Sequence, residues 1–344
     1  MRRCGSVILF LLLAGLVFAG IFYYAEMRAR QKRQEVQPEE RLEIYTDLPQ
    51  SALQIFDRPY YKEFGVGLSI TEMTPAQIVE NAEKGTIPDL YLVSQHTLDK
   101  LKDMNMLAVY ASDRTDTVLN GCKDEDGYWT GVWMNPAVFA VNTDFALTHP
   151  AFFYTWDEVL SRQSVRLVMT DFISADYSEE SLISLTEHFG REECFARLRS
   201  AAGHIVQYGK YLSTPAQMAA MDKCDIGISG FNEVMRVKQD GLPVKIIYPE
   251  DGTFYYLYGA ALSAAEARRE EAQRFMDWIL DSAARKPMLE KHGYYFLYVN
   301  ETRLPEDEAN MKIEFWPLEK KYTDEGKKDL LEQWLQQIRF GKDL

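Results

Sequence analysis

The chain has 344 residues, enough for about two domains of typical size. Hydrophobic residues make up 47% of the sequence and aromatic residues 13%, a composition that excludes a disordered protein and predicts well-filled cores. The formal net charge is −14 and basic residues cluster only near the N-terminus, which argues against a nucleic-acid-binding protein.

The N-terminal segment predicts contact with a membrane. An uncharged apolar run from Val7 to Tyr24 follows two arginines, the layout of a signal sequence or a membrane anchor. Cleavage after Ala19 would remove most of the run, but its continuation beyond that site favours an uncleaved anchor. We therefore expect residues 1–26 to be a signal sequence or anchor, followed by a charged linker over residues 27–40.

The cysteines and histidines predict no metal site and no cofactor. Beyond the leader, an odd number of cysteines (Cys122, Cys194 and Cys224) excludes a disulfide scaffold, although a Cys194–Cys224 bridge stays open. The spacing of cysteines and histidines does not match a zinc site, and the five histidines are scattered singly.

Strands and helices alternate from Arg41 onward. In the first set we expect strands over residues 42–45, 66–70 and 90–93, with helices over 51–63, 75–84 and 97–104. This alternation predicts a parallel sheet covered by helices on both faces. Ligands bind outside the carboxyl ends of such strands. The residues at those ends are Thr46, Asp47, Glu72 and Ser94.

A second set of strands and helices follows between about Asn142 and Gly241. Strands are expected over residues 137–142, 165–169, 225–228 and 243–248, and helices over 232–239 and in the segment that ends at Phe189. The chain is therefore expected to have an α/β fold with two sheets.

Motifs of common enzyme classes are missing. The run Gly227-Ile228-Ser229-Gly230 has the wrong glycine spacing for a nucleophile elbow, and the sequence has no P-loop, dinucleotide-binding or zinc-protease motif. We therefore do not expect an enzyme.

Several short motifs resemble those of one family, in the same order and over nearly the whole chain after the linker. They are LEIYTDLPQ at 42–50, PDLYLV at 88–93, YWTGVW at 128–133, FAVNTD at 139–144, YTWDEVL at 154–160, STPAQ at 213–217, DIGIS at 225–229, VMRVKQDGLPVKIIYPEDG at 234–252, EEAQRFMDWILD at 270–281, KHGYYFLYVN at 291–300 and FWPLEKKYTDEGKKDLLEQW at 315–334. From Arg41 to about Arg339 the chain resembles the extracytoplasmic solute-binding proteins of ABC importers, in the branch that includes binders of iron(III), polyamines, thiamine, phosphonates and sugar phosphates.

The resemblance implies a type 2 periplasmic-binding-protein fold of two lobes, each a central sheet flanked by helices, joined by a two-strand hinge. It implies that lobe one covers residues 41–137 and, after the return, 244–344, while lobe two covers 138–243. The crossings are expected at Val138–Val141 and Val244–Ile247, with the C-terminal helices on lobe one. The protein would act outside the cytoplasm as a monomer, capture a small ligand between its lobes and deliver it to an ABC transporter permease.

Two ligand classes of this family fit the sequence poorly. Iron(III) members carry two adjacent tyrosines where this chain has Gly230-Phe231-Asn232, and Tyr255-Tyr256 lies on another strand. Ser174 resembles the serine that binds anions in phosphate-type members, but Asp171 and Asp176 flank it and would repel a phosphate.

A cationic or zwitterionic organic ligand fits better, because carboxylates pair with ammonium groups and aromatic faces attract them. Either Tyr255 or Tyr256 is expected to face the ligand, whereas Phe254 and Tyr258 are expected in the core. Each carboxylate could instead be a helix cap or a turn former. The candidate ligand-binding residues are Thr46, Asp47, Glu72, Ser94, Trp133, Asp171, Ser174, Ser213, Asn232, Asp251, Tyr255 and Tyr256.

Two other functions stay open. If the apolar segment remains in the membrane, the protein could be a ligand sensor that signals to a receptor or kinase partner. The other alternative is a ferric-iron binder.

Overall fold

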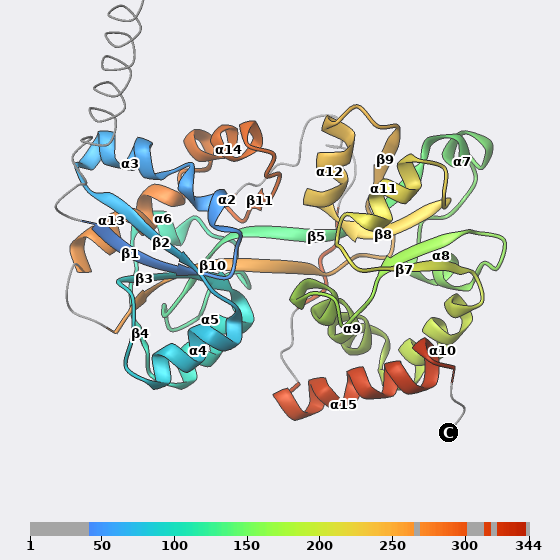
Figure 1. The fold of residues 1–344 in the computed structure, drawn as a ribbon, viewed down its shortest axis with the longest axis horizontal. Helices are drawn as coiled ribbons and strands as arrows, with labels where there is room; N and C mark the ends of the chain where they lie inside the picture. The colour runs from blue at the N-terminus through green and yellow to red at the C-terminus, as the bar shows by residue number, and fades with distance from the viewer. Residues whose placement is uncertain (1–40, 265–268, 301–312, 318–321, 342–344) are drawn as a thin grey trace, which may run out of the picture.

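The computed structural model describes residues 41–264, 269–300, 313–317 and 322–341. These residues form two lobes, each with a sheet between helices, joined by the long strand β5 and by the segment 248–254 that leads into β10 (Figure 1). Within this part of the chain, none of the helices has the length and apolarity needed to cross a bilayer. The apolar run 7–24 and the linker 27–40 lie outside the described residues.

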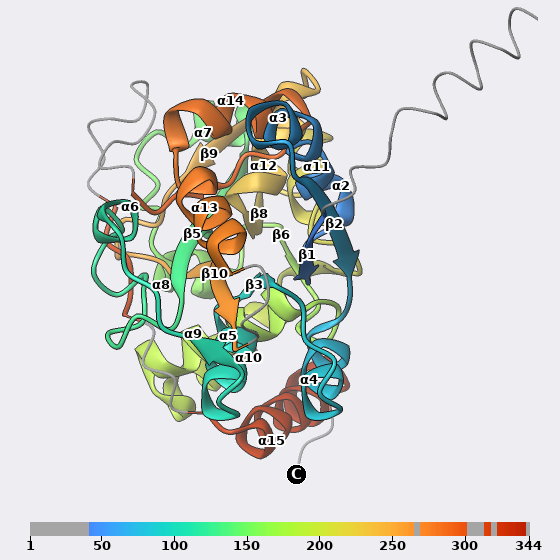
Figure 2. The ribbon, with the colours of Figure 1, turned by 90° about the vertical axis from the view of Figure 1, so that its left-hand side faces the viewer.

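Lobe one is built on three parallel strands in the order β2-β1-β3. Strand β10 lies next to β3 and is antiparallel to it, and the first half of β5 lies next to β10 and is antiparallel to β10. In Figure 2 this lobe faces the viewer, with α13 and β10 in front and α4 at the lower right beside α15. Its elements are β1 (Arg41–Thr46), α2 (Gln50–Gln54), α3 (Asp57–Phe64), β2 (Gly67–Glu72), α4 (Pro75–Glu83), β3 (Leu90–Ser94), α5 (Gln95–Asp103), β4 (Leu107–Ala108), α6 (Asp113–Asp116), β10 (Tyr255–Ser263), α13 (Arg269–Ile279), α14 (Ser282–Lys291) and β11 (Leu297–Tyr298).

Local sequence explains where the first helices begin. The Thr74 hydroxyl accepts a hydrogen bond from Gln77 N at 3.3 Å and the Gln77 side chain accepts one from Thr74 N at 2.9 Å, so α4 begins with a capping box. The single helix expected over residues 51–63 is two helices, α2 and α3. Pro59 causes this break, because proline has no backbone N–H and fits only in the first turn of a helix, where α3 carries it.

Lobe two has the parallel strands β8, β6 and β7, with the second half of β5 antiparallel to β8. The expected parallel sheets are therefore mixed: three strands of each lobe are parallel, and β5, β9 and β10 run antiparallel to their neighbours because the chain crosses between the lobes there. The elements of lobe two are β5 (Thr130–Asn142), shared with lobe one, α7 (Thr143–Thr148), α8 (Trp156–Ser161), β6 (Leu167–Thr170), α9 (Asp176–Phe189), α10 (Arg191–Ala202), β7 (Ile205–Gly209), α11 (Thr214–Ala220), β8 (Ile226–Gly230), α12 (Phe231–Gln239) and β9 (Val244–Ile247).

Strand β5 belongs to both sheets. Residues 130–136 pair with β10 of lobe one, and residues 137–142 pair with β8 and β9 of lobe two. All 13 residues of β5 are buried. The second crossing differs from the expected one. Val244–Ile247 is β9, which pairs with β5 inside lobe two, and the chain re-enters lobe one later, through residues 248–254.

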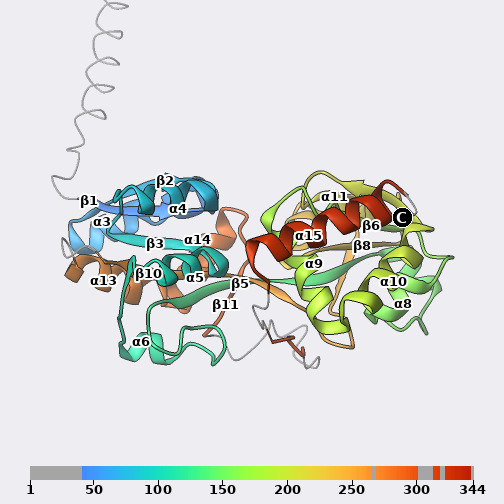
Figure 3. The ribbon, with the colours of Figure 1, turned by 90° about the horizontal axis from the view of Figure 1, so that it is seen from below.

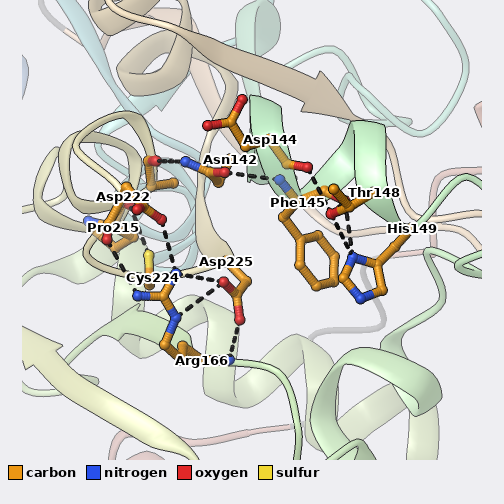
Figure 4. Close-up of polar contacts among 11 residues, drawn as sticks. Asn142, Asp144, Phe145, Thr148, His149, Arg166, Pro215, Asp222, Cys224 and Asp225 are labelled. Carbon is orange, nitrogen blue, oxygen red and sulfur yellow. Dashed lines mark hydrogen bonds and ion pairs between the residues drawn. The ribbon is translucent and has the colours of Figure 1, made fainter.

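The far end of β5 is fixed inside lobe two by side-chain hydrogen bonds (Figure 4). Asn142 caps α7, because its side-chain oxygen accepts a bond from Phe145 N at 2.9 Å, and its amide nitrogen donates to Ala219 O at 3.0 Å. Nearby, the Arg166 guanidinium contacts Asp225 at 2.6 Å and Asp222 at 2.9 Å, which ties the start of β6 to the start of β8. The end of β5 therefore moves with lobe two as one body.

The C-terminal helix lies on lobe two, whereas the sequence placed it on lobe one. Figure 3 shows α15 (Asp324–Trp334) starting between the lobes and running along α9 toward the C-terminus. A π-helical turn, Leu335–Arg339, continues it against α10. Trp334 explains the placement, because its fully buried ring packs against Phe172 and Tyr208 of lobe two at centroid distances of 5.1 and 5.7 Å.

The possible bridge between Cys194 and Cys224 is not formed. Both thiols are free and buried, as is Cys122. Burial raises the pKa of Cys194 and of Cys224 to about 12, so both are protonated and behave as small apolar side chains.

The turn at Gly252, inside the second crossing, gives a prediction. Gly252 has φ of +87°, and a Cβ there would lie 2.7 Å from Trp316 Nε1. Gly252→Ala is therefore expected to lower the free energy of unfolding by more than the ~1–2 kcal/mol that left-handed backbone alone costs an L-residue.

Gly241→Ala is the matched control, because Gly241 has φ of +79° but no atom within 4 Å of its Cβ position. Urea unfolding of both variants measures the difference. Equal losses of stability would contradict the crowding at Gly252.

Candidate functional site

The carboxyl ends of β1 and β3 meet at Asp47 and Ser94. Because β1 and β3 are parallel neighbours, their ends lie at one edge of the sheet. Ser94 N donates to both Asp47 carboxylate oxygens at 3.1 and 2.9 Å, and the Thr97 hydroxyl donates at 3.4 Å. Asp47 thus caps the start of α5, as one reading of the sequence allowed. The same carboxylate stands at the edge of lobe one that faces lobe two.

The environment of Asp47 favours its neutral form. The pKa of Asp47 is raised to about 6, mainly by burial and in smaller part by the nearby charge of Asp176, while the hydrogen bonds from Ser94 oppose the shift. Asp176 is the first residue of α9 in lobe two. The two carboxylates therefore interact across the gap between the lobes, and each would gain from a cation placed there.

Three tyrosines lie in this gap. The Tyr256 ring is 5.1 Å from the Tyr258 ring on the same face of β10, and 5.9 Å from the Tyr177 ring of α9. Burial raises the pKa of all three well above the usual value, and neighbouring acids raise it further. Each phenol is therefore neutral and keeps its hydroxyl proton. The buried Tyr177 hydroxyl has no hydrogen-bond partner among the described residues.

A buried carboxylate, Glu233, lies beneath Tyr177 and Tyr258 and is held by amides. It accepts hydrogen bonds from the side chains of Asn135 at 3.0 Å and Asn232 at 2.8 Å. Asn232 N in turn donates to the Asn135 side chain at 2.9 Å. The charge of Glu233 raises the pKa of both tyrosines. Among the described residues, no lysine or arginine forms an ion pair with Glu233, and its polar partners are amides.

Two hollows open between the lobes. Hollow one, of about 600 Å³, extends from Tyr256 toward Asp99, Asp124 and Glu187. Hollow two, of about 660 Å³, extends toward α4 and is lined by Asp176 and Glu179 among others. Each is large enough for a small organic molecule. The residues that line both hollows are Ser94, His96, Lys100, Glu180, Tyr256, Asp324 and Lys327.

The lining of the hollows is acidic. Ten carboxylates face the two hollows against four lysines, and no arginine lines either hollow. Burial raises the pKa of Glu179 and Glu180, while the nearby charge of Lys327 lowers it in part. No group of three or more histidine, cysteine, aspartate or glutamate side chains in the described part of the chain could hold a metal ion. The linings of the two hollows therefore hold more acidic than basic side chains.

Comparison with known proteins identifies the family. Residues 85–314, about two thirds of the chain, match the family described as bacterial extracellular solute-binding protein. The chain belongs to this family. An uncharacterized protein of Haemophilus influenzae is 22% identical over 251 residues, which cover 70% of this chain and 72% of that protein.

Solved structures of periplasmic binding proteins share the fold of this solute-binding protein. The periplasmic binding protein AfuA from Actinobacillus pleuropneumoniae, solved with fructose-6-phosphate, has 18% identity and a TM-score of 0.65 over 88% of this chain and 100% of its own. The ferric binding protein from Campylobacter jejuni has 17% identity and a TM-score of 0.70 over 85% of this chain and 97% of its own. The two-lobed fold expected from the sequence is thereby confirmed.

The structure brings a third of the twelve candidate residues to the gap of this solute-binding protein. Asp47, Ser94 and Tyr256 surround it and Asn232 belongs to its floor. Tyr255 lines hollow one, but its hydroxyl contacts the Cys122 thiol at 3.7 Å inside lobe one.

The other candidates have structural roles or lie elsewhere. Trp133 is fully buried between Phe56 and Phe296 in the core of lobe one, so its proposed place at a ligand is wrong and its truncation would test the core. The remaining residues are Thr46, which accepts a bond from Leu48 N; Glu72, which accepts one from Gln50 N; Asp171, which pairs with Arg339; Ser174, which is exposed; Ser213, which precedes α11; and Asp251, which accepts bonds from Trp156 N.

Several residues of the gap were missed from the sequence. Tyr258 was expected in the core and does pack against the cores of both lobes, while strand alternation also puts it on the same face of β10 as Tyr256. Asp176 and Tyr177 follow the Ser174 motif directly at the start of α9. The sequence around Glu233 and in α15 does not indicate a place in the binding site, because only the tertiary fold brings these residues to the gap.

The raised pKa of Asp47 gives a prediction about pH. An aspartate with a folded-state pKa of about 6 and an unfolded value of 3.8 binds its proton more tightly in the folded protein. Its contribution to stability is complete below about pH 4 and is lost as the pH rises through 6. Asp47→Asn keeps a neutral acceptor for Ser94 N, so its melting temperature relative to wild type should rise from pH 4 to pH 7.

The expected gain of the variant at pH 7 is on the order of 1 to 3 kcal/mol. Melting curves of both proteins between pH 4 and 8 measure it. A difference that stays constant over this range would show that Asp47 ionises without cost in the folded protein.

Proposed function

We propose that this protein is the solute-binding component of an ABC importer and that it captures a cationic or zwitterionic organic solute between its lobes for delivery to the permease. Its family supports the binding of a small molecule outside the cytoplasm. The observation that carries the choice of ligand is the acidic gap, where carboxylates from both lobes outnumber the lysines.

The carboxylates suit an ammonium group. The charge of Asp176 of lobe two acts unfavourably on the Asp47 carboxylate of lobe one. A cation between them would relieve this repulsion and lower both pKa values. Because the two acids come from different lobes, such a ligand would also favour the closed arrangement of the lobes.

The tyrosines suit the rest of such a ligand. The faces of Tyr177 and Tyr256 would attract a cation, and the unpaired Tyr177 hydroxyl would donate to a carboxylate or hydroxyl oxygen of the ligand. Lys327, which lines both hollows, could pair with the carboxylate of a zwitterion. The gap thus offers groups that could pair with both charges of a zwitterion, and the carboxylates, which would pair with its positive charge, outnumber the lysines.

Anionic ligands and iron are less well supported. A phosphate at the start of α9 would face Asp176 in the first turn, and the lining of the hollows has no arginine. For iron, residues 230–232 carry no tyrosine, and the buried phenols of the gap hold their protons. A ferric-iron site would therefore need a different ligand set from the paired tyrosines of the family's iron(III) members.

A thermal-shift screen of the purified chain tests the proposal. The compounds are putrescine, spermidine, thiamine, glycine betaine, basic amino acids, fructose-6-phosphate and ferric citrate. A ligand at 100 times its dissociation constant stabilises by ~2.7 kcal/mol, which a melting curve resolves. We expect an amine or zwitterion to give the shift, and Asp176→Asn to weaken its binding about ten-fold, because a charge-assisted contact is lost.

Asp144→Asn is the matched control, since Asp144 is also an acid in the first turn of a lobe-two helix but lies outside the gap. It should bind as wild type does. A shift with fructose-6-phosphate or ferric citrate alone would contradict the proposed ligand class. Uptake of the bound compound by cells with and without the protein then separates an importer from a membrane-anchored sensor, which would bind without transport.

A further inference from the structure

Helix α15 is fixed to lobe two along most of its length. Asp329 pairs with Arg191 of α10 at 2.8 Å, and Gln333 accepts a bond from the same arginine at 2.7 Å. At the next residue, the Trp334 ring is buried against Phe172. The C-terminal two thirds of the helix therefore belongs to the body of lobe two.

The first turn of α15 contacts lobe one instead. Asp324 is paired with Lys100 of α5 at 2.8 Å, and with His96 of α5 at 3.7 Å. Lys327, one turn later, lies 3.1 Å from a ring nitrogen of His96. Thr323 fixes the start of the helix by accepting a hydrogen bond from Gly326 N at 3.2 Å. The helix thus spans the gap, with one end on each lobe.

The spanning turn lies at the mouth of both hollows. Asp324 and Lys327 line hollow one and hollow two, together with His96 and Lys100 from the opposite side. Lys327 is 9% exposed and approaches Glu180 of lobe two at 3.8 Å. A solute could leave either hollow more easily if this turn separated from α5.

We propose that Asp324 is a positioning residue that holds the lobes closed: α15 is a strap carried by lobe two, and its first turn clamps α5 of lobe one over the gap. The proposal rests on the two-lobed binding mechanism above but not on the identity of the solute. The match to the solute-binding family ends at residue 314, ahead of α15, so it does not extend to this helix.

The ion pair that forms the clamp is weak because both of its side chains are exposed to solvent. The Asp324 and Lys100 side chains are 68% and 35% exposed, so the pair is screened by water and salt. Its loss should shift the equilibrium between closed and open lobes about two- to five-fold. Charge reversal should shift it further, because repulsion replaces attraction. An equilibrium of this kind lets a solute enter and leave while still favouring the closed form.

Electron paramagnetic resonance distances between the lobes test the proposal without any ligand. Spin labels are attached to Lys84→Cys at the end of α4 and Glu192→Cys on α10, both exposed. The cysteines at 122, 194 and 224 are buried and escape labelling, and Cys4 is replaced by serine in the full chain. We expect Asp324→Lys and Lys100→Glu each to enlarge the long-distance population at least about five-fold.

The double variant Asp324→Lys/Lys100→Glu restores the pair with exchanged charges and should return the distances to those of wild type. Glu325→Lys is the matched control, because it makes the same charge change in the same helical turn at an exposed residue, and the ion pairs from this turn to α5 in the described part of the chain are made by Asp324. Its distances should equal those of wild type. Melting temperatures confirm that each variant is folded, and Lys100→Glu carries the test if Asp324→Lys does not fold.

Unchanged distances in the folded single variants would overturn the proposal, as would an equal shift in Glu325→Lys or a double variant that stays open. These outcomes are independent of the ligand screen. A failed screen with a functioning clamp would refute the proposed ligand class, whereas a successful screen with unchanged distances would refute the clamp.

Discussion

The structure depends on one strand that belongs to two sheets. β5 pairs with β10 over its first half and with β8 and β9 over its second half, and every one of its residues is buried. Neither lobe can complete its sheet without it. The strand also fixes the position of the gap, because it joins the two lobes that form its sides. The carboxyl ends of β1 and β3 lie on the side of lobe one, and the start of α9 lies on the side of lobe two.

The gap holds charges that the protein alone does not neutralise. Asp47, Asp176 and Glu233 come from three different elements, and hydrogen bonds from amides and hydroxyls satisfy two of them without cancelling their charge. A folded chain tolerates such an arrangement where water or a ligand completes it. Proteins that share this fold include one solved with fructose-6-phosphate and a ferric binding protein, so the fold alone does not set the ligand, as expected when function lies in the site and not in the fold.

Much of the fold could be predicted because its signals are local. Short segments of the sequence determine the alternation of strands and helices, the cap at Thr74 and the motifs of the two-lobed family. The gap was predicted only where strand ends define it, at Asp47 and Ser94. Trp133 shows the limit: an aromatic residue looks the same in a core and at a ligand, and only its packing between Phe56 and Phe296 decides. The contribution of Glu233 and α15 depends on contacts between segments far apart in the chain.

The place of Trp334 also bears on how the chain folds. Lobe two is built mostly from residues 137–247, yet its core is finished by a ring that lies about ninety residues later, after the chain has visited lobe one again. Contacts of such long sequence separation form late and slow the folding of a domain. During synthesis, part of the apolar surface of lobe two therefore stays exposed to solvent until α15 leaves the ribosome. Truncation near the C-terminus would therefore leave an exposed apolar face on a lobe whose own segment is intact, a state prone to aggregation.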